Sequence, residues 1–179
     1  MTLTSYTLAS SSKGNSVYVS FGGDSLLIDA GISCRKIESA LKEIGADIRK
    51  LGAVVVTHEH SDHIAGLPTL AKKYGVPIHM TEASAREMLR SPKYLPTADF
   101  ITVHPPLFEL RVGEISVKSF VTPHDSVCSV GYRIEAGGKT LALATDIGHV
   151  TDGIERALTG AETVILESNH DENMLLVGS

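Results

Sequence analysis

Short apolar runs of strand length recur along the chain and are separated by turn residues. Alternating or β-branched apolar residues favour strands, and Gly-rich pairs such as Gly137-Gly138 favour hairpin turns. In the first half, strands are expected at Leu3–Ala9, Val17–Phe21, Ser25–Asp29, Ala53–Val56 and Val76–Met80. In the second half, they are expected at Phe100–Val103, Leu107–Leu110, Ile115–Val121, Val130–Glu135, Thr140–Ala144 and Thr163–Glu167.

Helical spacing of apolar residues appears between these runs. Ser33 can cap a helix that continues to about Ile44, and the other helices are expected at Ile64–Tyr74, Thr81–Arg90 and Thr151–Leu158. The proline-containing segment Ser91–Ala98 is expected to be a loop. Hairpins interleaved with helices predict an α+β fold, a sandwich of sheets with helices outside, formed by one domain over residues 1–179.

Composition limits the expected cellular location of the protein more than it limits the reaction. The chain has no apolar run near the ~20 residues of a membrane span, no recognisable signal peptide and two cysteines, so we expect a cytoplasmic protein without a membrane partner. The net charge of −5 argues against a broadly basic nucleic-acid surface. It does not exclude a nuclease, because bound divalent ions, with scattered residues such as Lys13, Arg35 and Lys93, would supply local positive charge.

The most informative segment is Thr57-His-Glu-His-Ser-Asp-His63, directly after the apolar run Ala53–Val56. His58 and His60 are two residues apart, so on an extended segment both imidazoles face one ion. Asp62 and His63 follow the turn and can face a second ion, although Asp62 could instead cap the next helix. A metal-free polar loop is the alternative, but three of the eight histidines lie here, which favours metal binding.

This His-x-His-x-Asp-His pattern after a hydrophobic strand resembles the signature of the metallo-β-lactamase superfamily. The resemblance implies a metallo-β-lactamase-like αββα sandwich, and hydrolytic chemistry without a particular substrate. It also implies that His124 completes the first metal site and that Asp146 bridges two ions. Asp29 is expected to support the metal loop through hydrogen bonds, and Asp125 to orient an imidazole.

Further segments resemble the YycJ/WalJ-type family: Leu8–Ser16, Leu27–Ser33, Thr57–His63, Ala144–His149 and Leu166–Asp171. That resemblance implies a bacterial cytoplasmic 5′→3′ DNA exonuclease with a role in DNA repair. Three consecutive serines stand at Ser10–Ser12, where the family usually has a glycine between serines. The family's later His-Leu-Ser-Asn segment is missing, so we expect a C-terminally shortened fold whose first metal site is more complete than its second.

The predicted mechanism is phosphodiester hydrolysis by a bridging water between two divalent ions, Zn²⁺ or Mn²⁺, with Fe also compatible. Asp62 is the expected catalytic residue, as proton acceptor or as the group that orients the water. Residues expected beside the metals or the DNA substrate are Ser12, Asn15, Asp29, Asp125, His149, Asn169 and His170. The open alternatives are a small-molecule phosphodiesterase or thioesterase of the same fold, and an inactive fragment or binding module. A sheet edge left open by shortening would favour a homo-oligomer.

Overall fold

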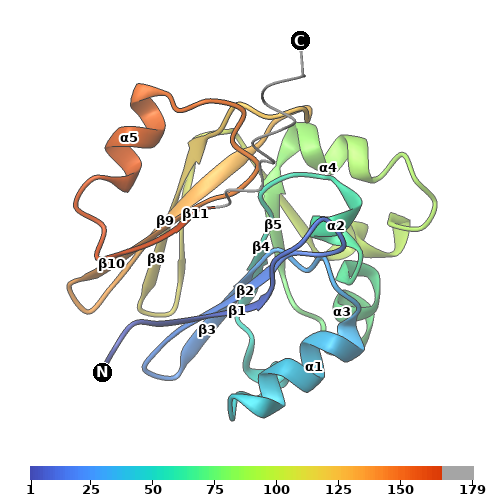
Figure 1. The fold of residues 1–179 in the computed structure, drawn as a ribbon. Helices are drawn as coiled ribbons and strands as arrows, with labels where there is room; N and C mark the ends of the chain where they lie inside the picture. The colour runs from blue at the N-terminus through green and yellow to red at the C-terminus, as the bar shows by residue number, and fades with distance from the viewer. Residues whose placement is uncertain (167–179) are drawn as a thin grey trace.

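The computed structural model describes residues 1–166 as two β-sheets packed face to face, with helices on both outer faces (Figure 1). The first sheet has the strand order β1-β2-β3-β4-β5-β6. Its strands β1 to β3 pair antiparallel, and β3 to β6 pair parallel. Their bounds are Thr4–Ala9, Ser16–Phe21, Asp24–Ile28, Ala53–Val55, Ile78–Thr81 and Ile101–His104.

The second sheet has the strand order β11-β10-β9-β8-β7. Its pairs are antiparallel except for β10 and β11, which run parallel. The parallel pair requires a crossover, which the helix α5 (Asp152–Leu158) provides. The strand bounds, from β7 to β11, are Glu109–Val112, Ile115–Val121, Val130–Ala136, Lys139–Ala144 and Thr163–Leu166.

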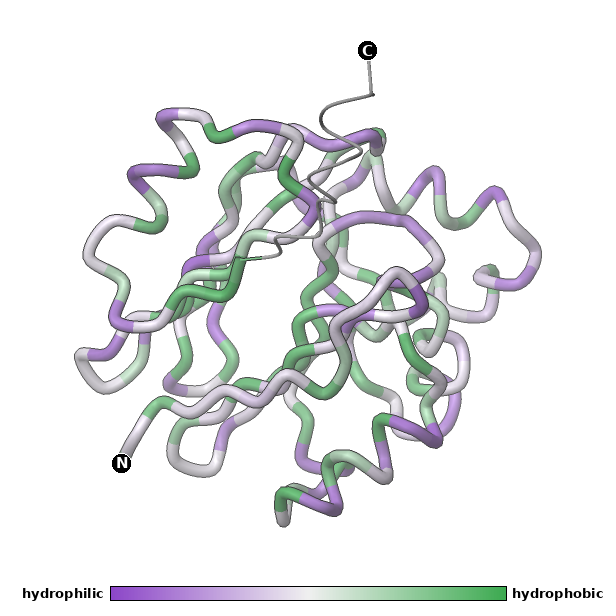
Figure 2. Tube along the Cα trace, viewed as in Figure 1, coloured by the Kyte–Doolittle hydropathy of each residue, from purple (hydrophilic) through white to green (hydrophobic). Residues whose placement is uncertain are grey.

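Three apolar contact regions hold these layers together. Successive residues of a strand face opposite sides, so Leu26 and Ile28 of β3 pack between the sheets while Leu27 packs against the helices. Ile154 of α5 packs against the outer face of the second sheet. Figure 2 shows the apolar residues following the strands and the inner helix faces. The helices over the first sheet are α1 Cys34–Glu43, α2 Ser61–Ile64, α3 Leu67–Tyr74 and α4 Glu82–Met88.

The expected αββα sandwich is therefore confirmed, with differences at some element boundaries. The helix expected at Ile64–Tyr74 is two helices, α2 and α3, because a new helix starts with Pro68 in its first turn. Since α2 begins at Ser61, Asp62 lies inside its first turn and does not cap it.

The proline-rich segment also differs from expectation. Part of the expected loop is the 3₁₀ helix η2, Leu95–Phe100, so the strand expected from Phe100 starts at Ile101. The hydroxyl of Thr97 donates to the Tyr94 carbonyl at 2.6 Å and tightens this turn. A further 3₁₀ helix, η1 at Ile48–Lys50, precedes β4 and was not anticipated.

The strand ends that matter for chemistry converge. Asp29 follows β3, residues 57–63 (the metal loop) follow β4, His124 follows β8 and Asp146 follows β10. The neighbouring strands β3 and β4 of the first sheet, and the strands β8 and β10 on either side of β9 in the second, therefore deliver polar side chains to one end of the sandwich. Within residues 1–166, no helix has the length and apolarity needed to cross a bilayer.

Candidate metal centre

Among residues 1–166, two overlapping groups of donors meet at His58. The first comprises His58, His60 and His124, and the second comprises His58, His63 and Asp146. Within each group the ligand atoms all lie within 4.8 Å of one another. One imidazole normally gives one nitrogen to one ion, so His58 can serve only one ion at a time. Five donor residues in two groups therefore suit two neighbouring ion sites better than a single one.

The imidazoles of the first group surround an open position. His58 lies 4.6 Å from His60 and 4.7 Å from His124, measured between ring centroids, with the rings close to perpendicular. The His124 Nε2 and His60 Nδ1 atoms are 3.3 Å apart. His60 reaches this position because it stands in extended conformation just before α2, two residues beyond His58.

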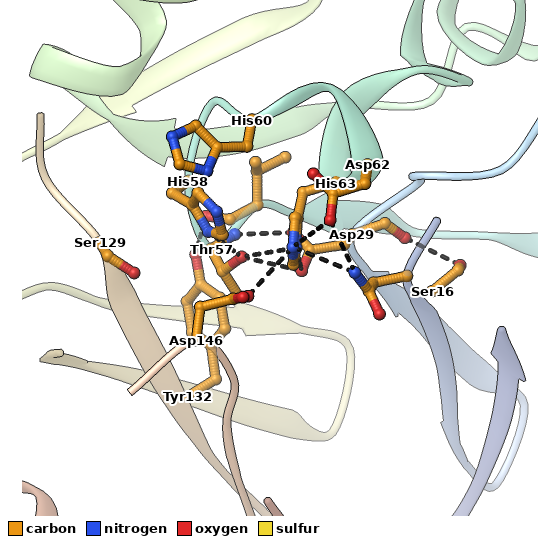
Figure 3. A network of polar contacts seen from close by, with 12 residues as sticks. Ser16, Asp29, Thr57, His58, His60, Asp62, His63, Ser129, Tyr132 and Asp146 are labelled. Atoms are coloured by element: carbon orange, nitrogen blue, oxygen red, sulfur yellow. Dashed lines mark hydrogen bonds and ion pairs between the residues drawn. The ribbon is translucent and has the colours of Figure 1, made fainter. Parts of the chain in front are cut away.

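Carboxylates gather around the second group. His63 Nε2 lies 3.1 Å from Asp146 Oδ2 and 3.4 Å from Asp62 Oδ2 (Figure 3). Asn15 Nδ2 lies 3.1 Å from His63 Nε2 and donates to Asp62 Oδ2 at 3.2 Å. This group is therefore richer in negative charge than the first and would attract a second cation.

A buried hydrogen-bond chain sets the orientation of His58. Asp29 accepts from the Thr57 backbone N–H and from the Thr57 hydroxyl, both at 2.8 Å. Because that hydroxyl hydrogen points to Asp29, its oxygen accepts from His58 Nδ1, 3.0 Å away. The Nδ1–H tautomer leaves a lone pair on His58 Nε2, which is the form that binds a metal.

The same carboxylate orients His63. Its Nδ1 atom lies 2.8 Å from Asp29 Oδ2, so Nε2 is turned toward Asp146 and Asp62. Burial by itself lowers the pKa of His63, but the Asp29 and Asp146 carboxylates outweigh it and raise that pKa to about 10. Burial, followed by repulsion from His63, instead lowers the pKa of His58 to about 3, so His58 is neutral.

Buried donor atoms show that this donor set fits a metal ion. His58 Nε2 is inaccessible to solvent and makes no hydrogen bond within the described residues, and Asp146 Oδ2 is equally inaccessible and faces His63 Nε2 at 3.1 Å. Burying a polar atom without a partner costs free energy, and a bound cation removes that cost. Burial raises the pKa of Asp146, but His63 and the other imidazoles lower it overall to about 2, so its carboxylate is ionised and ready to bind.

The backbone around the metal loop is tightly constrained. Asp29 and Asp146 have φ values of 60° and 52°, a left-handed conformation that is unfavourable for residues other than glycine and clusters at functional sites. Asn15 N–H donates to the Asp62 carbonyl at 2.7 Å. A Cβ on Gly31 would lie 1.6 Å from the same carbonyl oxygen, so only glycine allows this contact.

Comparison with protein families gives the ancestry of this arrangement. Residues 12–174 match the model of the metallo-β-lactamase superfamily. The chain belongs to that superfamily. Among solved structures, Zn²⁺-bound PqqB from Methylobacterium extorquens superposes with a TM-score of 0.71 over 90% of this chain and 63% of that one, at 24% identity, which shows the shared fold.

Within the metallo-β-lactamase superfamily, curated relatives include proteins named exodeoxyribonucleases. The chain is 40% identical over 176 residues to WalJ of Streptococcus pneumoniae and 37% identical over 175 residues to YycJ of Bacillus anthracis. The expected resemblance to this family is thereby confirmed. These alignments cover 96% of this chain, which spans 64% of the length of each relative.

The structure brings together most residues that the superfamily motif predicts, but not all. His58, His60, His63, His124 and Asp146 form the donor groups, and Asp62 lies beside the second group without belonging to it. The residues predicted beside the site divide into buried Asn15 and Asp29, which contact it, and exposed Ser12, Asp125 and His149. Asn169 and His170 lie outside the described residues.

Thr57 is the functional position that the sequence pattern did not reveal. It is the first residue of the motif segment, yet a threonine after a strand has no distinctive signal. Its role depends on Asp29, which is 28 positions away and reaches it only because β3 pairs with β4. Pairing of these strands, rather than any local pattern, creates the support for His58.

Proposed function

We propose that this chain carries the catalytic centre of a metal-dependent phosphodiester hydrolase that acts on DNA as a 5′→3′ exonuclease. The observation that carries the proposal is the pair of donor groups sharing His58, whose solvent-inaccessible Nε2 atom has no hydrogen-bond partner within the described residues. The similarity to proteins named exodeoxyribonucleases supports DNA as substrate. Action on DNA in repair would place the protein in the cytoplasm.

The residues divide between two cation sites. His58, His60 and His124 would hold one ion, and His63 and Asp146 would hold the other. A bridging role for Asp146 is what the family resemblance implies. Two divalent ions would acidify a bridging water and neutralise charge on the phosphorane-like transition state. His58 and His63 are held for this task by Thr57 and Asp29, so their orientation does not depend on substrate.

Asp62 is the proposed proton acceptor. Its side chain is 27% exposed, so it borders the solvent-facing side of the centre rather than its interior. Asn15 fixes one of its oxygens through the 3.2 Å hydrogen bond. A carboxylate held beside the metal donors, but outside both groups, is placed to orient or deprotonate an attacking water.

The donor chemistry narrows the metal. The first group consists of three imidazoles and the second of two imidazoles and one carboxylate, and neither contains a thiolate, which suits Zn²⁺ or Mn²⁺ and is compatible with Fe. Cys34 does not compete with these donors for the metal, because burial raises the pKa of its thiol to about 11 and keeps the thiol protonated in the apolar core under the helices.

Exposed strand edges such as β1 support a homo-oligomer, which light scattering would test.

The test combines metal content with cleavage. Purified protein would be analysed for Zn, Mn and Fe and then assayed on 5′-labelled single-stranded DNA with and without Mn²⁺. His58→Ala and Asp146→Ala should abolish cleavage without unfolding the chain, whereas Asp99→Ala, an exposed aspartate on η2, should cleave normally.

Each result has a distinct meaning. About two metals per chain with metal-dependent cleavage supports the proposal. Retained turnover in both alanine variants contradicts the assigned centre. Cleavage of a small phosphodiester or thioester but not of DNA would favour the small-molecule hydrolase, and metal binding with no hydrolysis would favour the non-catalytic fragment.

A further inference from the structure

A cleft of about 590 Å³ opens beside the first donor group. One of its walls is the metal loop, including His60, and the opposite wall is the end of α4 with the start of η2. Residues 125–127, which follow His124, form its third side. Its volume is within the ~300–1,000 Å³ range of small-ligand sites. Anything bound here lies next to a metal ligand.

The inner surface of this cleft is apolar. Ile64, Met88 and Tyr94 line it and are buried, with exposed fractions of 1%, 3% and 7%. Val127 stands at its rim and is 53% exposed. Such a surface favours a ligand part with a flat apolar face over a hydrated ionic group.

Carboxylates dominate its charged groups, whereas the serine hydroxyls of the lining can both donate and accept. Glu59, Glu87 and Asp125 contribute carboxylates, and no lysine or arginine is among the described residues that line it. Glu59 Oε1 accepts from the Val127 backbone N–H at 3.1 Å, while Glu59 Oε2 has no hydrogen-bond partner within residues 1–166. Arg90 contacts the lining only by pairing with Glu87, at 2.9 Å.

Charge then decides which part of a nucleotide fits. A phosphodiester in this cleft would face three carboxylates of the lining. The Lys93 ammonium lies 3.2 Å from the Tyr94 hydroxyl, outside the lining, so the lining itself favours a neutral group over a phosphate. A nucleobase is neutral, has apolar faces that pack on side chains, and carries N–H donors on its edge for carboxylate and hydroxyl acceptors. The phosphate to be cleaved belongs at the donor groups, one nucleotide unit away.

We propose that this cleft binds the nucleobase adjacent to the scissile phosphate, packed on Ile64, Met88 and Tyr94 with its N–H edge toward Glu59 and Asp125. The cleft thereby positions the strand so that its phosphate, and not its base, meets the metal donors. This inference rests on the proposed function and names how that centre would recognise its substrate. It also explains how an acidic chain holds DNA without a basic surface.

The experiment uses single-stranded oligonucleotides that carry one abasic residue at the first, second or third position from the 5′ end. With metal-loaded wild-type protein, the abasic residue should lower kcat/KM about tenfold at only one of these positions, the effect expected when one packed base is lost. Val127→Trp should fill the cleft, so that abasic and intact strands are then cleaved with about the same kcat/KM. Val103→Trp, at a residue of β6 that is 51% exposed and outside the cleft, should keep the tenfold difference.

The outcomes separate this inference from the function on which it rests. Equal cleavage of abasic and intact strands by the wild-type protein, with Val127→Trp unchanged, overturns base binding in the cleft and leaves the nuclease standing. Cleavage of neither strand by metal-loaded wild-type protein overturns the proposed function and this inference with it. Metal analysis of Val127→Trp must match the wild type, because a loss of metal would show that the substitution acts on the donor groups, which contradicts the assigned role of Val127.

Discussion

Removal of the Thr57 hydroxyl tests the claim that Asp29 and Thr57 prepare His58 for metal. Thr57→Val has nearly the same volume and replaces only the hydroxyl, at a side chain that is 1% exposed. It removes the 2.8 Å hydrogen bond to Asp29 Oδ2 and the 3.0 Å contact with His58 Nδ1. Asp29 Oδ2 keeps its contact with His63, so His58 is the group left without a partner.

Two magnitudes follow from these contacts. One buried N–H without an acceptor costs about 1–3 kcal/mol, so Thr57→Val should lower the free energy of unfolding by about 2 kcal/mol. His58 is also released from the Nδ1–H tautomer, and loss of such an orienting partner usually weakens metal binding about 10- to 100-fold. We expect a weakening of that size for Zn²⁺ and for Mn²⁺.

The assay is a competition titration against a chromophoric chelator, with urea unfolding of the metal-free protein in parallel. Thr57→Ser is the matched control, because it keeps the hydroxyl and loses one buried methyl group worth about 1 kcal/mol. It should be slightly less stable but bind metal as the wild type does. Wild-type affinity in Thr57→Val, or an equal loss in Thr57→Ser, would refute the reasoning.

Three further changes have defined outcomes. Gly31→Ala would place a Cβ 1.6 Å from the Asp62 carbonyl oxygen and should lower the free energy of unfolding, measured in urea, by more than about 3 kcal/mol. Gly23→Ala, whose Cβ would have no atom within 4 Å, should stay within about 0.5 kcal/mol of wild type. Equal effects of the two substitutions would contradict the close approach at Gly31. In metal-free protein the pKa of His63 is raised from 6.5 to about 10, so the contribution of protonated His63 to folding stability is complete below about pH 6.5 and is lost as pH rises toward 10. Asp29→Asn should flatten this pH dependence of the free energy of unfolding. An unchanged slope would argue against the His63–Asp29 ion pair. Metal at about 100 times its Kd should add about 2.7 kcal/mol of stability, seen as a rise in Tm that EDTA reverses and His58→Ala abolishes; a full rise in that variant would place the metal elsewhere.

The sequence pattern predicted a strand or helix correctly where its formation depends on residues close to one another in the sequence. The short apolar run of β3 reflects burial on both faces and the helical spacing of α1 reflects one buried face, and both elements appear in the structure close to their expected bounds. The split between α2 and α3 and the 3₁₀ turn at η2 were missed. They depend on proline placement and on single hydrogen bonds such as that of Thr97, which periodicity does not register.

The sequence by itself determined that one loop holds three histidines and an aspartate after a buried strand, and therefore the kind of chemistry at the site. Only the tertiary structure decided which donors share an ion, because His124 and Asp146 reach His58 through the packing of the second sheet on the first. It also decided the role of Thr57 and the acidic cleft beside His60. Residue type is local information, whereas distances between strand ends follow from sheet pairing across the whole chain.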